Sequence, residues 1–384
     1  MNILFYCNVF PNPQLGGIQS STCTLASGFI ALGHSCYCSY FEDEPIKIAS
    51  ISESLFLSLT QQKKNELQKM IIEKDIHIII NQSLHILANV DFLYQTVSEI
   101  NKPCKIYTVY HNRPGIKIYK STIPLVSIKN LMKRFFFPLY CWYTNFSEEK
   151  SIKKALSFSN ALVLLSQRYK DDFIKNYHIE TFLQGKITAV PNASHYNNVG
   201  NVNFDEKRRE VLIVARFDEN QKRISLAIKI WKMIEANTKS NDWVLRIIGH
   251  GPCATDYINL VKELGIKRII FEGKKDALKY YQYASIFMMT SAYEGWPMTV
   301  IEAMQNGVVP IVFNSYSAVY DILTDEEDGI IIENNDIKDY ADRLAALMED
   351  NVLREKMAKN AITKVQNFCV DKIVEQWLTV FNNF

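Results

Sequence analysis

Two glutamates separated by seven residues mark the stretch SAYEGWPMTVIEAMQNG, residues 291–307. Glu294 follows the apolar run SIFMMTS, which is typical of a buried strand, and Glu302 falls within a helix-like segment. Carboxylates accept hydrogen bonds from hydroxyl groups. The spacing therefore predicts one carboxylate in a loop and one on the following helix, both able to hold a hydroxyl-rich ligand.

The start of that helix is a candidate anion site. Pro297 suits its first position, where the missing N–H costs nothing, and the amides of Met298 and Thr299 would be left free to bind phosphate. Residues 300, 301, 303 and 304 form the apolar face, so Glu302 is expected on the roughly opposite side. A single glutamate there is ordinarily a solvated residue that the helix dipole favours. Two carboxylates that bracket a phosphate site favour a functional interpretation.

Two cations follow the strand-like run VLIVARF, residues 211–217. Arg216 ends the run, and Lys222 lies in the loop before the next helix. Ligands of open parallel sheets bind beyond the carboxyl ends of strands, and two cations there can neutralise a diphosphate without a metal. Solvated surface bases are the plainer interpretation of such a pair taken alone.

The first half of the chain holds a second set of candidates. Gly16 and Gly17 lie between the first strand and its helix, where glycine permits close backbone approach to a phosphate. A tight turn explains them equally well from the residues alone. His111 ends the run KIYTVYH, so it is expected at a strand end, although a lone histidine is more often structural.

Residues 117–154 combine basic and aromatic side chains. This mixture suits an anionic membrane surface or a lipid-pyrophosphate acceptor. A core helix with a basic outer face is the alternative. The residues that would carry the membrane or acceptor contact are Lys129, Lys133, Arg134, Phe135, Phe136 and Trp142.

Strand-like runs alternate with amphipathic helices throughout the 384 residues, which predicts an α/β protein with two Rossmann-like parallel sheets. The polar, asparagine-rich stretch 192–210 is expected to link them. The predicted domains are residues 1–200, 201–364 and a C-terminal helix, 365–384, that packs on the first domain.

Composition argues against several functional classes. A net charge of +2 does not suggest a nucleic-acid binder, and the eight cysteines lack metal-type spacing. The N-terminus lacks the features of a secretory leader, and no apolar run is long enough to span a membrane. The acidic pairs and runs at 171–172 and 325–328 are expected on surface helices or turns. No metal site is predicted.

Together these motifs resemble the retaining glycosyltransferases of family 4, which have the GT-B fold of two Rossmann-like domains facing across a cleft. The resemblance rests on Glu294-x7-Glu302, on Arg216 and Lys222, on GHGP at 249–252 and on the glycines at 16–17, and it covers essentially the whole chain. It is strongest from 211 to 343.

The resemblance also implies residue roles. Glu302 would bind the ribose, Glu294 the donor sugar, and Arg216 with Lys222 the departing diphosphate, leaving open whether Arg223 replaces Lys222. His111 would lie near the donor sugar. The remaining donor contacts would come from the backbone or side chains of Gly16, Gly17, Gly249, Gly273, Lys274, Gly295, Trp296, Pro297, Met298 and Thr299.

The implied activity is metal-independent transfer of a hexose from a nucleotide-diphosphate sugar to a lipid-linked or polysaccharide acceptor. UDP-galactose or UDP-glucose is preferred to UDP-N-acetylhexosamine or GDP-mannose as donor. The resemblance places the enzyme in bacterial assembly of lipopolysaccharide, O-antigen or capsule. It would act in the cytoplasm, at the inner face of the membrane.

Three alternatives belong to other classes. Gly249-x-Gly251-x-x-Ala254, with Glu272 about 20 residues on, is a fair match to the dinucleotide fingerprint of an NAD-dependent oxidoreductase. It follows the second strand of its domain rather than the first, which counts against it. A non-catalytic sugar-binding protein would keep the same site, and a pyridoxal-dependent phosphorylase would need a lysine motif that the sequence does not display.

Overall fold

The computed structural model describes residues 1–13, 16–42, 46, 48–115, 128–194, 202–236 and 242–384. The chain divides into two compact units: unit 1 contains residues 1–195 and 368–384, and unit 2 contains residues 196–367. The boundaries predicted from the sequence lie a few residues from these, and residues 195–201 of the predicted linker lie outside the described residues. The C-terminal helix α16 (Val370–Asn383) lies in unit 1.

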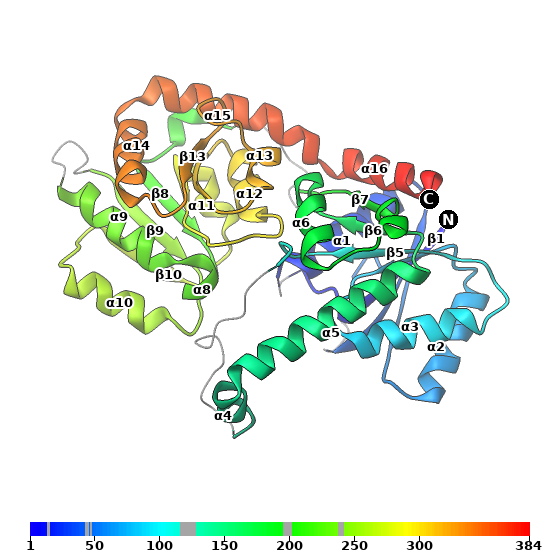
Figure 1. The fold of residues 1–384 in the computed structure, drawn as a ribbon. Coiled ribbons are helices and arrows are strands. Elements are labelled where there is room, and N and C mark those ends of the chain that lie inside the picture. The colour runs from blue at the N-terminus through cyan, green and yellow to red at the C-terminus, as the bar shows by residue number, and fades with distance from the viewer. Residues whose placement is uncertain (14–15, 43–45, 47, 116–127, 195–201, 237–241) are drawn as a thin grey trace. The chain divides into compact units, whose positions relative to one another are not determined.

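Unit 1 is built on a parallel sheet with the strand order β3-β2-β1-β4-β5-β6-β7 (Figure 1). Apolar runs such as ILFY and III are buried in its centre, as expected of strands covered on both faces. The strands are β1 (Asn2–Val9), β2 (Ser35–Glu42), β3 (Glu53–Phe56), β4 (Ile78–Asn81), β5 (Lys105–Tyr110), β6 (Ala161–Leu164) and β7 (Ile187–Ala189).

Helices lie in most of the connections between these parallel strands, although none of the described helices lies between β2 and β3. The helices are α1 (Gly17–Ala31), α2 (Gln61–Glu73), α3 (Leu87–Ser98), α4 (Ile128–Phe135), α5 (Phe137–Phe158), α6 (Lys170–Asn176) and α7 (Thr181–Gln184). Figure 1 shows the second half of α5 beside the sheet, whereas α4 and the first half of α5 extend away from it.

Unit 2 repeats this plan with the order β10-β9-β8-β11-β12-β13, again all parallel. Its strands are β8 (Glu210–Val214), β9 (Val244–Ile248), β10 (Ile269–Gly273), β11 (Ile286–Met289), β12 (Val309–Asn314) and β13 (Ile330–Glu333). Its helices are α8 (Glu219–Lys222), α9 (Ile224–Ala236), α10 (Ala254–Glu263), α11 (Leu278–Tyr283), α12 (Met298–Gln305), α13 (Val319–Ile322), α14 (Ile337–Glu349) and α15 (Asn351–Val365).

The two sheets confirm the predicted fold class of two parallel α/β domains. In each sheet the strand order reverses between the first strand and a neighbour reached later in the chain: β1 and β4 in unit 1, β8 and β11 in unit 2. Ligands of such sheets bind at the carboxyl ends of the strands at this switch point. Within the described residues, no helix combines the length and apolarity needed to cross a bilayer.

Candidate functional site

The strongest candidate site lies in unit 2, at the carboxyl ends of β8 and β11. These adjacent strands flank the switch point, and the loops that follow them contain Arg216 and Glu294. The loops are joined directly, because the Ala292 amide donates a 2.7 Å hydrogen bond to the carbonyl of Gln221. Parallel topology therefore brings the residues predicted from two distant segments to one edge of the sheet.

Lys222 and Glu294 form an ion pair at this edge. The Lys222 Nζ lies 2.6 Å from Glu294 Oε1, and the two side chains are only 15% and 7% exposed. The second carboxylate oxygen accepts a long hydrogen bond of 3.5 Å from Gln221 Nε2. Each charge compensates the other in this structure. The Lys222 ammonium can bind a diphosphate, and the Glu294 carboxylate can accept hydrogen bonds from sugar hydroxyls.

Arg216 joins the same group through Gln221. Its Nη2 donates to Gln221 Oε1 at 3.0 Å, while Gln221 Nε2 donates to the carbonyl of Tyr293 at 3.4 Å. The Arg216 side chain is otherwise exposed. The site thus presents one guanidinium to solvent beside an ammonium that is held close to the loop.

Arg223 has a different role from Lys222. It lies in the left-handed region with φ +47°, and its guanidinium donates to the carbonyls of Thr290 and Ser291, each at 2.8 Å. It also donates to the side chain of Asn334 at 3.0 Å. These contacts hold the loop after β11 in place. The sequence left open whether Lys222 or Arg223 contacts the diphosphate. Because the Arg223 guanidinium is hydrogen-bonded to backbone carbonyls, Lys222 is the better candidate.

The start of α12 differs in detail from the prediction. Pro297 is the residue before the helix rather than its first residue, and the Met298 amide donates to the carbonyl of Trp296 at 2.9 Å. The expectation that this amide is free was therefore wrong. Thr299 is half-buried, and among the described residues the structure gives its amide no partner. Among the residues that the structure describes, the Thr299 amide is therefore the remaining candidate for phosphate binding in the first turn.

Glu302 is half-buried rather than solvated. Its Oε2 accepts a hydrogen bond of 3.1 Å from the hydroxyl of Tyr281. Burial raises the pKa of Glu302 to about 7, against the opposing effect of the Tyr281 hydrogen bond. The apolar side chains predicted to line the core face of α12 are buried, so only the environment of the glutamate differs from expectation.

The packing of the GHGP turn, residues 249–252, accounts for its two glycines. Gly249 has φ +148°, and a Cβ there would lie 1.8 Å from the carbonyl oxygen of Ala215. A Cβ on Gly251, at φ +156°, would lie 2.6 Å from the carbonyl oxygen of Phe217. Glycine is required because this turn packs directly against the backbone that carries Arg216. Its role is to shape that loop.

Glu272, the acidic residue of the possible dinucleotide fingerprint, already forms ion pairs within the protein. Glu272 pairs with Arg246 and, at 2.7 Å, with Lys275. Gly273, at φ +73°, accepts a 2.9 Å hydrogen bond from the Gly249 amide through its carbonyl, and Lys274 is exposed beside it. The geometry therefore does not favour an NAD site.

In unit 1, Gly16 precedes α1 with φ +154°, and Gly17 is the first residue of that helix. His111 comes directly after β5 and is buried, with its Nε2 hydrogen-bonded to Gln82 Oε1. Burial lowers the pKa of His111 to about 3, with a further lowering by His85. Its imidazole is therefore neutral at physiological pH and can exchange hydrogen bonds but not supply charge.

The basic aromatic segment forms α4 and most of α5. Residues 117–127 of the predicted stretch lie outside the described residues, as does the side chain of Lys129. Lys133 and Arg134 lie half-buried in the last turn of α4. Large apolar side chains are exposed on both helices, in proportions of 50% to 81%: Met132, Phe135, Phe136, Leu139, Trp142, Tyr143 and Phe146. These seven residues are called the apolar patch below.

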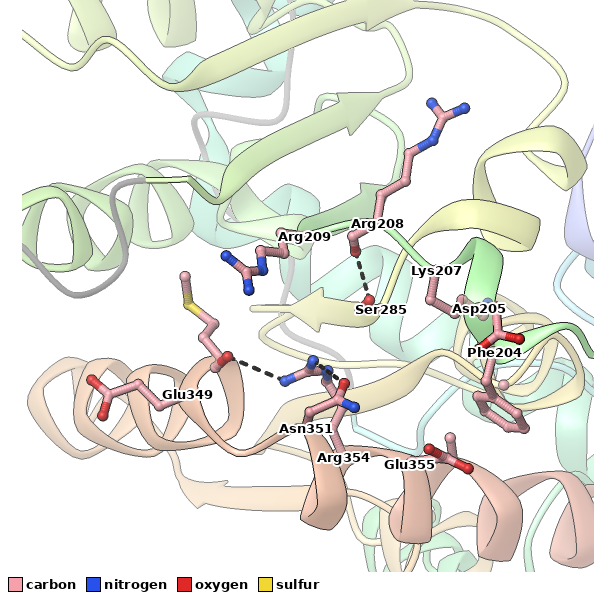
Figure 2. A pocket seen from close by; sticks show the side chains of 13 residues that line it. Phe204, Asp205, Lys207, Arg208, Arg209, Ser285, Glu349, Asn351, Arg354 and Glu355 are labelled. Atoms are coloured by element: carbon pink, nitrogen blue, oxygen red, sulfur yellow. Dashed lines mark hydrogen bonds between the residues drawn. The ribbon is translucent and has the colours of Figure 1, made fainter.

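Unit 2 also has a cavity of about 220 Å³ away from the predicted site. Figure 2 shows its cations, including Arg209 and Arg354. Arg354 donates to the Leu347 carbonyl at 2.7 Å and to Asn351 Oδ1 at 2.7 Å, and Arg209 pairs with Asp242. Arg354 and Arg209 therefore bind groups of the protein itself at the ends of helices and in loops. None of the predicted site residues lines this cavity.

Residues 197–364 match the family described as glycosyl transferases group 1. A Campylobacter jejuni α-1,4-N-acetyl-D-galactosaminyltransferase, named for a diphospho-undecaprenol-linked glycan, is 27% identical over 205 residues, covering 52% of this chain and 55% of that protein. An Escherichia coli UDP-Gal:α-D-GlcNAc-diphosphoundecaprenol α-1,3-galactosyltransferase is 23% identical over 250 residues, covering 60% of this chain and 62% of that protein.

The chain spans about half the length of the curated relatives that it matches. The structural likeness covers the whole chain: the structure of Anabaena HepE in complex with UDP superposes with a TM-score of 0.75 at 14% identity, over 100% of both chains. The described residues thus reproduce both parallel sheets of known GT-B structures. Residues 197–364 are similar in sequence to the glycosyl transferases group 1, and the chain has the GT-B fold.

Proposed function

We propose that this protein is a retaining glycosyltransferase of family 4 that uses a nucleotide-diphosphate hexose. The observation that carries the proposal is the Lys222–Glu294 pair at the switch point of the sheet in unit 2, inside the region that matches the family. The diphosphate would take Lys222 and the exposed Arg216, and the donor sugar would take Glu294. Glu302 would bind the ribose hydroxyls.

The proposed reaction breaks the bond between the sugar and the diphosphate with oxocarbenium character. Lys222, Arg216 and the Thr299 amide would stabilise the charge that develops on the leaving diphosphate. The acceptor hydroxyl would attack from the same face, and its proton would pass to the leaving phosphate oxygen. Because side-chain cations supply the positive charge, we propose that no metal is needed, and UDP release should be unaffected by EDTA.

The preferred donor is UDP-galactose or UDP-glucose. The named relatives include one galactosyltransferase and one N-acetylgalactosaminyltransferase, and HepE was crystallised with UDP. UDP-N-acetylhexosamine is therefore retained as an alternative donor, and GDP-mannose is the other alternative that the resemblance leaves open. The backbone near Gly273 and Lys274 would contact the base.

The proposed acceptor is a lipid-linked glycan in bacterial cell-surface polysaccharide assembly. Both relatives are named for diphospho-undecaprenol-linked substrates, and the apolar patch with Lys133 and Arg134 suits an anionic lipid surface. We propose peripheral attachment to the inner face of the cytoplasmic membrane through this patch.

A thermal-shift panel of UDP-, GDP- and ADP-sugars tests the donor proposal. A ligand that binds only the folded state raises the free energy of unfolding, by about 2.7 kcal/mol at a concentration 100 times the Kd. We expect UDP-hexoses to raise the melting temperature most. A non-catalytic sugar-binding protein would give the same shift without releasing UDP, and an NAD-dependent enzyme would respond to NAD instead.

A further inference from the structure

A second carboxylate site lies in unit 1, at the carboxyl edge of its sheet. Glu148 on α5 is surrounded by residues that follow other elements: His85 in the loop after β4, Tyr110 at the end of β5 and Tyr177 just after α6. Its Oε1 lies 3.2 Å from the hydroxyl of Tyr177, 3.3 Å from His85 Nδ1 and 3.4 Å from the hydroxyl of Tyr110. Three polar groups thus converge on one oxygen.

The direction of these hydrogen bonds follows from their neighbours. Asn112 Nδ2 lies 3.2 Å from His85 Nε2; since the amide group donates there, His85 carries its proton on Nδ1 and donates to Glu148. The hydroxyls of Tyr110 and Tyr177 lie 2.6 Å apart. Burial, with the charge of Glu148 contributing, raises the pKa of both tyrosines, so both hydroxyls are protonated. Each hydroxyl has one proton, and one of them donates to the other hydroxyl, so only one tyrosine donates to Glu148.

The other oxygen of Glu148 is open. Every contact that the structure gives this carboxylate is to Oε1, so among the described residues Oε2 has no partner, and the side chain is 29% exposed. Glu149, the next residue, is equally exposed but pairs with Lys153 at 2.7 Å and His178 at 3.5 Å. Glu149 forms an ordinary surface ion pair, whereas the Glu148 carboxylate is held by His85 and by the hydrogen-bonded tyrosine pair, with one acceptor oxygen left open.

This geometry suits a neutral ligand that donates hydrogen bonds. A phosphate would be repelled by the carboxylate, but a sugar hydroxyl supplies the donor that Oε2 lacks. The site adjoins β4 and β5 beside His111 and Gln82.

We infer that Glu148 binds a hydroxyl group of the acceptor glycan and helps to select the acceptor. The inference rests on the proposed function, since it assigns the acceptor side of the same reaction. Tyr177, Tyr110 and His85 act as positioning residues that hold the carboxylate in one orientation. Its open oxygen then determines where an acceptor hydroxyl can lie.

The test uses the full chain with N-acetylglucosamine-diphosphate-lipid carrying a short lipid tail as the probe. UDP release from UDP-galactose or UDP-glucose is measured with and without the probe, and binding of the probe alone is measured by thermal shift. E148Q is expected to raise the KM for the probe at least tenfold, with donor affinity and probe-independent UDP release unchanged. E149Q, with the same exposure on the same helix, should behave as the parent protein.

The outcomes separate the two proposals. If the parent protein binds no nucleotide sugar and releases no UDP, the proposed function fails. If it binds the donor but not the probe, or if E148Q and E149Q have equal KM values for the probe, the acceptor assignment is overturned. If E148Q melts at a lower temperature than the parent protein, E148D, which keeps the charge, is also measured. The KM of E148D for the probe is expected to rise less than that of E148Q. A KM of E148Q for the probe equal to that of the parent protein would overturn the inference.

Discussion

At the residue scale, the central feature is that the two groups proposed to hold opposite ends of the donor are paired with each other. Lys222 and Glu294 are 2.6 Å apart and largely buried. Removing one partner of such a pair leaves a poorly solvated charge, so each group depends on the other for compensation. Donor binding must replace this contact by charge-assisted hydrogen bonds to phosphate and by hydrogen bonds from sugar hydroxyls.

Glu302 gives a prediction about pH. Its pKa of about 7 in the folded protein exceeds the ordinary value, so burial favours the protonated acid. The protonated Glu302 carboxyl makes its full contribution to the free energy of unfolding below the ordinary glutamate pKa. This contribution is lost as the pH rises to about 7. E302Q should therefore stabilise the protein relative to the parent at pH 8 by about 1–2 kcal/mol and have little effect at pH 5. Chemical denaturation at both values measures the difference.

The control for this experiment is E327Q, which alters an exposed turn residue. As an exposed surface substitution, it should change stability by less than about 0.5 kcal/mol at either pH. An E302Q effect that is equal at pH 5 and pH 8 would show that the carboxyl titrates outside this range.

The sequence predicted that Arg216, Lys222 and Glu294 lie near strand ends, but it did not predict the contacts that they make. Strand ends can be located from apolar runs, and parallel topology then brings them together. The sequence could not separate Lys222 from Arg223, because the left-handed backbone of Arg223 and its bonds to the loop after β11 are tertiary features. The Glu148 cluster was missed for the same reason: no local motif marks its members.

At the scale of elements, the turn after β9 shapes the loop after β8. Gly249 and Gly251 lie against the backbone of residues 215–217, so a side chain on either would displace Arg216. The glycines that resemble a dinucleotide fingerprint are thus explained by packing between strand ends.

G249A tests this role. The added methyl group would lie 1.8 Å from the carbonyl oxygen of Ala215 at a backbone angle that favours glycine. A loss of about 3 kcal/mol or more in stability is expected from denaturant unfolding. Gly265 has φ +64°, and a methyl group there would meet no atom within 4 Å, so G265A should cost only about 1 kcal/mol. Equal losses would contradict the packing argument.

The apolar patch on α4 and α5 gives a prediction about membranes. Replacing Phe135 and Trp142, which are 81% and 61% exposed, by glutamate should reduce co-sedimentation with anionic vesicles several-fold. The matched control is F182E on α7, because Phe182 is 76% exposed outside the patch. Unchanged co-sedimentation of the double variant, or an equal loss with F182E, would refute membrane attachment through this surface.

Some elements could not be predicted from local sequence. β3 is an edge strand with mostly exposed residues, ESLF, and it lacks the buried apolar signal of its neighbours. Pro297 lies one residue before its helix because the Met298 amide turns back to Trp296, a detail of loop geometry that residue types do not encode.

At the scale of the whole molecule, the chain returns to its first unit at its end. α16 packs on α1, where a Cβ on Gly28 would lie 2.6 Å from both Val370 and Val374. Trp377 and Phe381 are buried on the same helix, and Phe381 contacts Phe29 and Tyr107. The last helix is thus part of the core of unit 1.

W377A should accordingly destabilise unit 1. Trp377 is 3% exposed, and large-to-small substitutions of buried tryptophan cost about 3–5 kcal/mol. W142A is the matched control, because Trp142 is 61% exposed and should change stability by less than about 0.5 kcal/mol. Thermal or denaturant unfolding measures both, and similar values for the two variants would show that α16 contributes no core.

The overall architecture was predictable because alternating strands and helices specify parallel sheets almost independently of residue detail. The packing of the C-terminal helix on the first domain was also among the expectations. The contacts that build each site were not predictable, since they join residues such as His85, Glu148 and Tyr177 that lie far apart in the sequence.

The most direct test of the account is a calorimetric titration of UDP into the parent protein, K222M and K229M. Lys222 faces Glu294 in the proposed diphosphate site, whereas Lys229 is exposed on α9. Loss of a charge-assisted hydrogen bond costs about 1.5–3 kcal/mol, so K222M should bind UDP about ten to a hundred times more weakly. K229M should bind as the parent does. Equal affinity of K222M and the parent protein for UDP would contradict the central claim.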